Sequence, residues 1–404
     1  MDIDAQVELL MQGTQYGDEN LYHAMAGELR ERLLEAQTTG RKLRVYCGFD
    51  PRKPDLHIGH TVPMRKLRQF QDLGHEVLFV VGTYTSLIGD PSDQDKLRAI
   101  LTPQQAQENA RTYAEQAFRI LDREKTLVRY NDEWLSKLTF SDLIRLASNF
   151  SIQQFLTRDA FRQRWDRGDA IYLHETFYSL MQGYDAYALQ ADVQVGGTDQ
   201  LFNIVTAARK LMVSLGGRPN VAIILGILPG TDGVVKMSKS LGNHIPISTD
   251  AVDMYGKIMS IPDAAMPAYC RLATRWTPDE ISQFERSIQA GDLHPRDAKM
   301  RLACEITAAF YGDEDALDAQ EAFARVFQKH AIPEEMPSLT CLPGQTILDI
   351  LVASGAVRTR NEGRRIIAQH GVRFAGQLVA EPDVTITTPG ILQVGKRKFF
   401  RISV

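Results

Sequence analysis

The chain has 404 residues, which is enough for two or three domains with a sizeable core. Its formal net charge of −4 and its 44% of hydrophobic residues are ordinary for a soluble globular protein. This balance excludes a generally basic nucleic-acid binder, so any RNA site must be a local basic patch.

The first 40 residues or so predict helices, with an amphipathic stretch from Leu21 to Leu34 that is expected to pack on a following sheet. The amino terminus has no signal-peptide profile, and no apolar run approaches the length of a membrane span. The four cysteines form no CxxC pair, which argues against a disulfide framework or a zinc site. We therefore expect a cytoplasmic protein with no membrane segment and no metal site of its own.

A strand, a loop and the start of a helix are predicted in residues 43–60, LRVYCGFDPRKPDLHIGH. Alternating apolar residues give the strand, and Gly48, Asp50 and two prolines end it. His57 and His60 follow, three residues apart, where the helical pattern of 60–73 begins. A helix start offers unpaired N–H groups and the positive end of a dipole, so this junction suits a phosphate.

Short apolar runs alternate with helical patterns up to about residue 245. The runs lie at Leu43–Cys47, Val77–Val81, Leu127–Tyr130, Val193–Val195 and Val221–Leu228. The helical patterns lie near 60–73, 103–121, 141–149 and 174–190. This alternation predicts an α/β fold with a Rossmann-like, doubly wound parallel sheet, whose ligands bind beyond the carboxyl ends of the strands.

Polar residues follow two of these strands. Asp90 stands between a glycine and a proline in TSLIGDPS, where a tight turn with a capping aspartate is the ordinary alternative. Two glycines precede Thr198 and Asp199 in VGGTDQ and allow a ligand close to the backbone. Either residue could instead cap a helix over 200–215, and capping and binding are compatible.

The helical pattern near 174–190 places Tyr178, Gln182 and Asp185 on one face, because they are spaced four and three residues apart. A solvated polar stripe is the plain alternative. Farther along, Lys236-Met237-Ser238-Lys239-Ser240 follows an apolar run and a Pro-Gly turn. Two lysines and two hydroxyls can hold a polyphosphate, although such a run is usually a solvated loop.

HIGH at 57–60 and KMSKS at 236–240 together, in this order and each after a strand, resemble the two signatures of class I aminoacyl-tRNA synthetases. YCGFDP around Tyr46 and YSLMQGYD in the helix resemble bacterial-type tyrosyl-tRNA synthetases, and Asn131 and Trp134 also fit that family's pattern. The resemblance covers nearly the whole chain.

The resemblance implies a tyrosine site and an ATP site. Tyr46 and Asp185 would hydrogen-bond the substrate phenol, although Tyr46 alone would be read as an ordinary core tyrosine. Phenylalanine would leave these buried polar groups unpaired and would therefore be rejected. This family is a well-known example of such a rejection. Asp90 would take the α-ammonium, with Tyr178, Gln182 and Thr85 close by. Asp199 would contact the ribose, and Gln200 the adenylate or the substrate. The ATP site would be lined by Gly48, Asp50, Gly59, Gly196, Met237, Ser238 and Ser240.

The same resemblance makes His57, His60, Lys236 and Lys239 the catalytic residues. Asp93 and Gln94 depart from the family, which often has glycine and lysine there, so Lys96 or Arg98 is expected to supply the basic charge instead. No inserted editing domain is predicted between the signatures.

Residues 246–335 read as mainly helical, with a helix start at Thr277 and a long helix over 295–311. Prolines mark a linker at 336–344, and the tail at 345–404 has nine Lys and Arg against four Asp and Glu. The tail resembles the small α+β RNA-binding fold first known in a ribosomal small-subunit protein. Its expected RNA-binding residues are Arg358, Arg360, Arg364 and Arg365, against the alternative of a merely soluble basic tail.

The implied reaction joins L-tyrosine to ATP, with Mg²⁺ carried by ATP, and then transfers tyrosine to the 3′ end of tRNA(Tyr). A homodimer is the common state of the family. Three alternatives remain: a tryptophanyl-tRNA synthetase, which should lack the Tyr46 and Asp185 pair; a cofactor-making nucleotidyltransferase, which needs no tRNA domains; and a non-catalytic RNA-binding protein on a synthetase scaffold.

Overall fold

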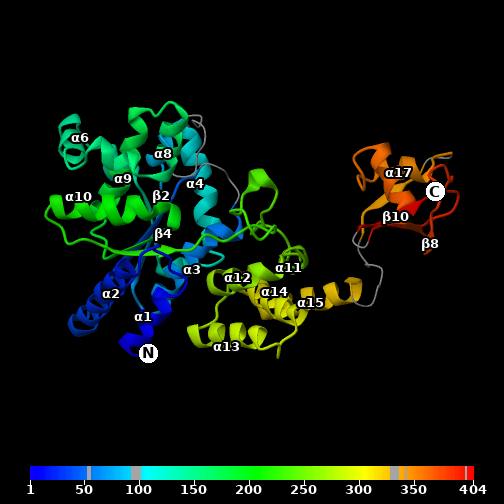
Figure 1. Ribbon diagram of the computed structural model, residues 1–404, viewed down its shortest axis with the longest axis horizontal. Coiled ribbons are helices and arrows are strands. Elements are labelled where there is room, and N and C mark those ends of the chain that lie inside the picture. Colours follow the sequence, from blue (N-terminus) through cyan, green and yellow to red (C-terminus); the bar gives the residue numbers. More distant parts are fainter. Residues whose placement is uncertain (52–55, 92–101, 328–335, 342–343, 396–397) are drawn as a thin grey trace. The chain divides into compact units, whose positions relative to one another are not determined.

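The computed structural model describes residues 1–51, 56–91, 102–327, 336–341, 344–395 and 398–404 (Figure 1). The chain divides into two compact units, Met1–Ala316 and Leu317–Val404. Each unit has its own sheet and is described by itself.

The first unit is built on a parallel sheet of five strands. In chain order these are β1 (Arg44–Phe49), β2 (Glu76–Val81), β3 (Thr126–Tyr130), β4 (Val193–Gly197) and β5 (Val221–Leu225). They lie in the order β3-β2-β1-β4-β5, so the chain turns back between β1 and β4. The α/β fold with a doubly wound parallel sheet is thereby confirmed, and the turning point marks the edge where a ligand is expected.

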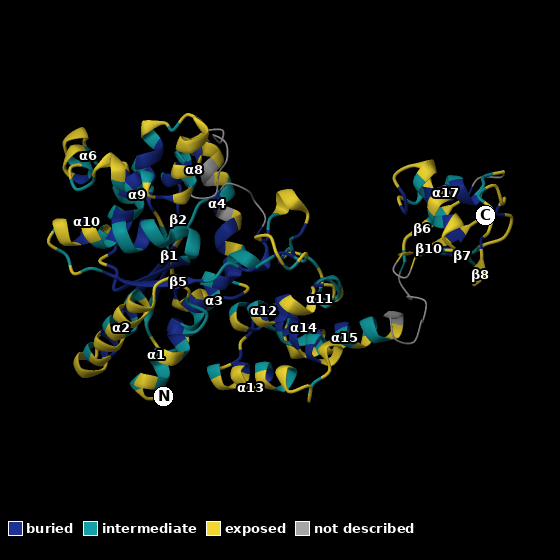
Figure 2. Cartoon of the chain, viewed as in Figure 1, coloured by how far each residue is buried: buried dark blue, intermediate teal, exposed yellow. Residues whose placement is uncertain are grey.

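The inner strands of the sheet are largely buried on both faces, as Figure 2 shows, whereas the edge strand β3 is mostly half-buried or exposed. Tyr46, Leu78 and Val80 pack with residues of α9 (Leu173–Ala188) and α10 (Arg209–Ser214) on one face. The alternate residues of β1 and β2 point to the other face, against α3 (Ile58–Asp72). Coverage on both sides explains why β2 and β5 are near-continuous apolar runs.

The first unit contains many further helices. They are α1 (Ile3–Met11), α2 (Glu19–Thr39), α4 (Pro103–Ala117), α5 (Asp132–Leu135), α6 (Phe140–Ala147), α7 (Ile152–Leu156), α8 (Asp159–Arg167), α11 (Ala251–Met259), α12 (Met266–Ala273), α13 (Pro278–Gln289) and α14 (Pro295–Tyr311). The helix starts follow the sequence: Thr277 caps α13 with a reciprocal bond from Glu280. α15 (Asp313–Phe327) contains the division between the units.

The helix expected over 200–215 has a different geometry. Thr198–Gln200 is a 3₁₀ turn, Phe202–Ala208 is π-helical, and only α10 is a regular α-helix. Periodicity cannot separate these forms, because all three bury a similar apolar stripe. A π-helical turn widens the backbone spacing and often lies at a functional site.

A short segment between α1 and α2 lies along the outer edge of β5. Thr14 bridges Leu225 in the antiparallel sense, and the Gln15 N–H donates to the Ile224 carbonyl at 2.7 Å. The Tyr16 hydroxyl donates to the Ala222 carbonyl at 2.6 Å. These bonds cover a strand edge that would otherwise be open.

The second unit has a mixed sheet in the order β6-β10-β9-β7-β8. Its elements are β6 (Ser338–Thr340), α16 (Ile347–Ala353), α17 (Arg360–Ala368), β7 (Val372–Phe374), β8 (Gln377–Leu378), β9 (Gly390–Val394) and β10 (Lys398–Ser403). Apolar residues of both helices and of the strands form one core, which includes Ile350, Ile367 and Leu392.

The domain boundaries expected after residues 245, 335 and 344 stay a prediction. Within the expected linker, Ser338–Thr340 forms β6 and pairs with β10. Among the described residues, no helix combines the length and the apolar character needed to cross a membrane.

Candidate active site

Two segments about 180 residues apart in the sequence meet at the carboxyl edge of the sheet. The Ile58 N–H donates to the Ile245 carbonyl at 3.0 Å, and His57 forms a bridge with Pro246. A Cβ added to Gly59 would lie 3.0 Å from the His57 ring and 3.6 Å from the Met237 Cβ. The HIGH and KMSKS stretches are therefore neighbours, and Gly59 permits their close approach.

The two histidines stand at the start of α3. His57 is the N-cap, and its backbone N–H donates to His60 Nδ1 at 3.2 Å. The two rings lie 3.8 Å apart between centroids, with His57 buried. Imidazole N–H groups and helix N–H groups thus gather in one place, which suits a phosphate oxygen.

The KMSKS loop contacts the turn that follows strand β4. Lys236 Nζ lies 3.0 Å from Asp199 Oδ2, in the 3₁₀ turn after β4. Met237 is buried, whereas Lys239 is exposed, and Ser238 and Ser240 share a hydrogen bond of 2.8 Å. One face of the loop is therefore anchored by Met237 and Lys236, and Lys239 lies on its exposed face.

Asn243 holds this loop from behind, a role that no sequence motif indicated. Its side-chain oxygen accepts the Ser238 N–H at 2.8 Å, and its amide nitrogen donates to Asp232 at 2.5 Å and to the Lys236 carbonyl at 3.3 Å. Asn243 is buried, and a Cβ on Gly230 would lie 2.2 Å from its nitrogen. A buried polar residue after a signature would have been the signal.

A buried polar pocket is the expected tyrosine site, and the structure shows a buried cluster of polar side chains around Asp185. Asp185, only 4% exposed, accepts from Trp134 Nε1 at 2.7 Å and from Asn131 Nδ2 at 3.2 Å. Tyr46 comes from the adjacent strand, and its hydroxyl donates to the Gln182 carbonyl at 3.5 Å. Three elements, β1, the turn after β3 and α9, thus close on the side chains that were predicted to recognise a phenol.

Burial dominates the electrostatics of this pocket. It raises the pKa of Asp185 from 3.8 to about 8, against the opposing hydrogen bonds from Trp134 and Asn131. It also raises the pKa of Tyr46 well above its ordinary value, and the negative charge of Asp185 adds to this. The two groups therefore interact, although the hydrogen bonds described above join each of them to other residues.

A second polar group joins the pocket to the strand ends. The Thr85 hydroxyl donates to Asp50 at 2.7 Å and accepts from Asn131 at 3.0 Å. A Cβ on Gly82 would lie 2.2 Å from the Asp50 carboxylate and 2.3 Å from the Thr85 hydroxyl, so only glycine fits there. Burial, followed by the Asp50 and Asp90 charges, raises the pKa of Tyr178 well above its ordinary value.

Three residues that were expected to bind a ligand, Gln182, Gly48 and Gly196, differ in how closely other atoms surround them. Gln182 Oε1 is buried and has no hydrogen-bond partner among the described residues. Gly48 is exposed, and a Cβ there would meet nothing within 4 Å. Gly196, in contrast, is packed: a Cβ would lie 2.5 Å from Ile204. An unsatisfied buried acceptor at Gln182 and the open space at Gly48 are each a place for a polar ligand.

Asp90 and Gln200 meet although they follow different strands. Gln200 Nε2 donates to Asp90 Oδ2 at 2.5 Å. The buried guanidinium of Arg158, which the sequence did not single out, lies 3.7 Å from the other Asp90 oxygen. The expected basic substitutes Lys96 and Arg98, like Asp93 and Gln94, lie outside the described residues.

The four expected RNA-binding arginines all belong to the second unit. Arg358, Arg360, Arg364 and Arg365 are all exposed, and Arg360 pairs with Asp349. Arg364 and Arg365 are consecutive residues of α17. The geometry leaves these two side chains accessible to an anion.

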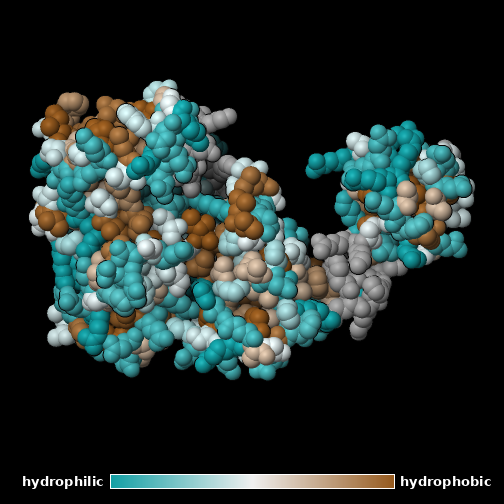
Figure 3. Space-filling model, in the orientation of Figure 1, coloured by the Kyte–Doolittle hydropathy of each residue, from teal (hydrophilic) through white to brown (hydrophobic). Residues whose placement is uncertain are grey.

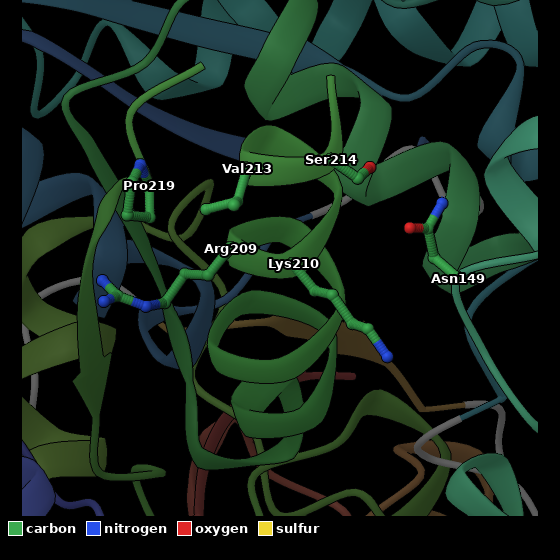
Figure 4. A pocket seen from close by; sticks show the side chains of 6 residues that line it. All are labelled: Asn149, Arg209, Lys210, Val213, Ser214 and Pro219. Carbon is green, nitrogen blue, oxygen red and sulfur yellow. The ribbon is translucent and has the colours of Figure 1, made fainter. Parts of the chain in front are cut away.

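A surface hollow of the first unit lies apart from the candidate site. Figure 4 shows that it is lined by Asn149, Arg209, Lys210, Val213, Ser214 and Pro219, with the Arg209 and Lys210 side chains pointing in different directions. Pro219 precedes β5, so this hollow lies toward the amino ends of the strands. In the described part of the chain, no group of three or more His, Cys, Asp or Glu side chains could hold a metal ion.

The buried Asp185 predicts a pH dependence of stability. Its pKa in the folded chain, about 8, exceeds its ordinary value of 3.8, so its protonated form favours folding and that contribution is lost as pH rises between these values. We expect Asp185→Asn to lower this loss, so that its free energy of unfolding falls less than that of the unaltered chain from pH 5 to pH 9. Urea midpoints measured at several pH values test this, and parallel curves for the two proteins would contradict it.

Comparisons with known proteins agree with this geometry. Residues 38–328 match the family model for class I tRNA synthetases (W and Y). Tyrosine–tRNA ligases of Thermotoga maritima and Oleidesulfovibrio alaskensis are 46% and 42% identical, over 92% and 100% of this chain and 93% and 100% of their own lengths.

Solved structures show the same fold. A C-terminally truncated mitochondrial tyrosyl-tRNA synthetase of Aspergillus nidulans matches with a TM-score of 0.62 and 23% identity, over 80% of this chain and 94% of that one. A tyrosyl-tRNA synthetase of Archaeoglobus fulgidus, complexed with L-tyrosine, matches with a TM-score of 0.59 and 20% identity, over 79% and 100%. With the signatures joined at the sheet edge and the family model spanning most of the chain, this protein belongs to the class I tRNA synthetases of the tryptophan and tyrosine branch.

Proposed function

We propose that this chain is a tyrosine–tRNA ligase, which activates L-tyrosine with ATP and transfers it to tRNA(Tyr). One observation carries the choice of tyrosine: Tyr46, Asn131, Trp134 and Asp185 form a buried polar cluster in the unit that contains the joined signatures. A pocket of this kind can pair a phenol hydroxyl. An indole substrate has a single N–H donor and no acceptor, so it would not need both the Tyr46 hydroxyl and the Asp185 carboxyl group.

In the first step, the tyrosine carboxylate attacks the α-phosphate of ATP and pyrophosphate leaves. The carboxylate is already a nucleophile, so the protein needs no general base and acts by positioning and charge stabilisation. His57 and His60, at the start of α3, face the transferring phosphate in this proposal, and Lys236 and Lys239 face the leaving pyrophosphate. Magnesium would come with ATP and neutralise its phosphate oxygens.

Tyrosine occupies the deeper part of the site in this proposal. Tyr46 and Asp185 pair with the phenol, and Asp90 takes the α-ammonium through a charge-assisted bond. Thr85, Tyr178 and Gln182 lie beside it, and the unsatisfied Gln182 oxygen is a further acceptor for the ammonium.

The nucleotide lies above the strand ends. Asp199 contacts the ribose and Gln200 the adenylate or the substrate, in line with their position after β4. The other assigned contacts come from the strand-end glycines and from the signature loop: Gly48, Asp50, Gly59, Gly196, Met237, Ser238 and Ser240. Open space above Gly48 supports a ligand there.

In the second step, a terminal ribose hydroxyl of tRNA attacks the adenylate carbonyl and takes the tyrosyl group. We assign catalysis to residues 1–245, the anticodon side to 246–335, and RNA binding by exposed arginines to 345–404, after a linker at 336–344. Basic residues on a compact fold suit the backbone of folded RNA. The protein would act in the cytoplasm.

We further propose a homodimer that uses the helices α6 to α9. Their surface carries large exposed apolar side chains, among them Phe140 at 77%, Leu173 at 65% and Trp165 at 64% exposure. Figure 3 shows hydrophobic groups gathered over this end of the first unit. Exposed apolar clusters of this kind mark association surfaces.

The test of the function is amino-acid-dependent exchange between ATP and pyrophosphate, with tyrosine, tryptophan and phenylalanine compared. Exchange with tyrosine alone is the expected result, followed by charging of tRNA(Tyr). Exchange with tryptophan would mean that the pocket assignment is wrong. A folded, RNA-binding chain without any exchange would favour the non-catalytic scaffold.

Removing the Tyr46 hydroxyl should weaken the selection of tyrosine. Tyr46→Phe takes away one partner of the phenol, so we expect KM for tyrosine to rise about 2- to 10-fold, as for one neutral hydrogen bond. Exchange with phenylalanine should not fall. Tyr255→Phe is the matched control, because this buried hydroxyl also lies 3.5 Å from a carbonyl, but in the helical region. Equal effects of the two substitutions would contradict the role of Tyr46.

A further inference from the structure

Asp90 is the last member of a series of buried and partly buried hydrogen bonds to which the proposed reaction assigns no role. Arg158 donates to the Ser179 hydroxyl at 3.0 Å, and Ser179 donates to Asn203 Oδ1 at 2.7 Å. Asn203 Nδ2 donates to Gln200 Oε1 at 3.0 Å, and Gln200 Nε2 donates to Asp90 at 2.5 Å. Ser179 and Asn203 are fully buried, at 0% exposure.

The direction of this series is fixed at both ends. A guanidinium has only donors and a carboxylate only acceptors. Because Arg158 donates to Ser179, the serine proton is directed to the Asn203 oxygen, and the Asn203 nitrogen must face Gln200. The Gln200 oxygen is then occupied, and its nitrogen is turned to Asp90. Each member therefore dictates how the next side-chain amide is oriented.

The local fold keeps the members in place. Arg158 precedes α8, and its guanidinium lies 5.0 Å from the centre of the Phe161 ring and 5.2 Å from that of Phe202. Ser179 lies in α9 between Tyr178 and Gln182, and Asn203 lies in the π-helical turn. Stacking on two aromatic rings compensates a buried guanidinium for part of its lost hydration.

We propose that Arg158, Ser179 and Asn203 form a one-directional relay that orients Gln200 and Asp90 toward the α-ammonium of the substrate. They are positioning residues, since they act through Gln200 and Asp90. The proposal rests on the proposed function, because it deepens the assignment of Asp90 to the ammonium group. Without the relay, the Gln200 amide can turn its oxygen to Asp90, and the carboxylate loses the hydrogen bond from Gln200 that helps to orient it beside Arg158.

The test is Ser179→Ala in the full chain, which removes one oxygen and interrupts the relay. We expect KM for tyrosine in pyrophosphate exchange to rise roughly tenfold or more, because the lost orientation affects a hydrogen bond to a charged group. KM for ATP should stay unchanged. The inhibition constant of 3-(4-hydroxyphenyl)propionate should also stay unchanged, because this analogue keeps the phenol and carboxylate but lacks the ammonium.

Thr176→Val is the matched control on the same helix. The Thr176 hydroxyl is also buried but donates to the Leu173 carbonyl within the helix, so its loss should leave all three constants unaltered. If Ser179→Ala does not fold, Asn203→Asp interrupts the relay without a change of shape, and the same selective loss is expected.

The outcomes separate the two proposals. A loss of affinity that is equal for tyrosine and the analogue, or no loss for either, would overturn the relay while tyrosine-dependent exchange by the unaltered chain upholds the function. No exchange by the unaltered chain would overturn both.

Discussion

Replacing His60 by alanine is expected to slow tyrosyl-adenylate formation by about 10²–10³, equivalent to about 2.7–4 kcal/mol, as for the loss of one preorganised donor to a developing charge. His60 lies at the start of α3, with its ring centroid 3.8 Å from that of His57, where the proposal places a phosphate oxygen. Tyrosine affinity should be nearly unchanged, because the contact forms with the transferring phosphate. Single-turnover rates and equilibrium dialysis with tyrosine measure the two quantities.

Lys239→Ala should have a similar effect on the rate, since Lys239 is exposed and faces the leaving pyrophosphate in the proposal.

His23→Ala is the control for His60→Ala, because His23 is an exposed histidine on α2. His60 is a cleaner target than His57, which is buried and caps the helix. Equal losses in tyrosine affinity and rate would show that these side chains support the pocket instead of the phosphate.

Replacing Arg364 and Arg365 together by alanine is expected to weaken tRNA binding with little effect on tyrosine activation. Both side chains are exposed on α17. If each neutralises one phosphate, the slope of log affinity against log salt should fall by about 1.4 to 1.8 in total, at about 0.7–0.9 for each neutralised phosphate. Binding measured at several salt concentrations gives the slope, and pyrophosphate exchange gives the activation rate.

Arg360→Ala is the informative comparison for this pair. Arg360 is exposed as well, but it pairs with Asp349, so part of its charge is already compensated. Its removal should change the salt slope less than the removal of either Arg364 or Arg365. An unaltered slope in the double variant would mean that the tail is basic for solubility alone.

Short apolar runs were sufficient to predict the five strands, because the inner strands of a doubly covered sheet are apolar along most of their length, and the more exposed edge strand β3 still carries Leu127 and Val128. The strand order could not be derived from the runs, since their composition does not say which neighbours they choose. The edge segment at Thr14 was missed for the same reason: its bonds to β5 are backbone bonds, which have no side-chain signature. The π-helical turn was missed because its apolar spacing resembles that of an α-helix.

The candidate site, like the fold, could be predicted only in part from the sequence. Residues inside recognisable motifs, such as Tyr46, Asp90 and Asp185, could be named from the sequence, and the structure places them around one region at the strand ends. Their supports were missed. Arg158 lies far from Asp90 in the chain, and Asn243, which follows the KMSKS signature by a few residues, has no motif of its own. The roles assigned to all these residues stay predictions until the variants are measured.

The antiparallel contact between Gly13–Gln15 and the end of β5 also has a consequence for synthesis of the chain. The segment leaves the ribosome early, but the strand it covers is complete only when Leu225 has been made. During this interval the backbone groups of Gly13–Gln15 must be hydrated by water. The chain between this segment and β5 forms a long loop, which must close before the strand edge is covered. Shortening the amino terminus beyond residue 16 would leave β5 as an unprotected edge in the finished protein, and we expect such a chain to aggregate more readily while its catalytic residues remain intact.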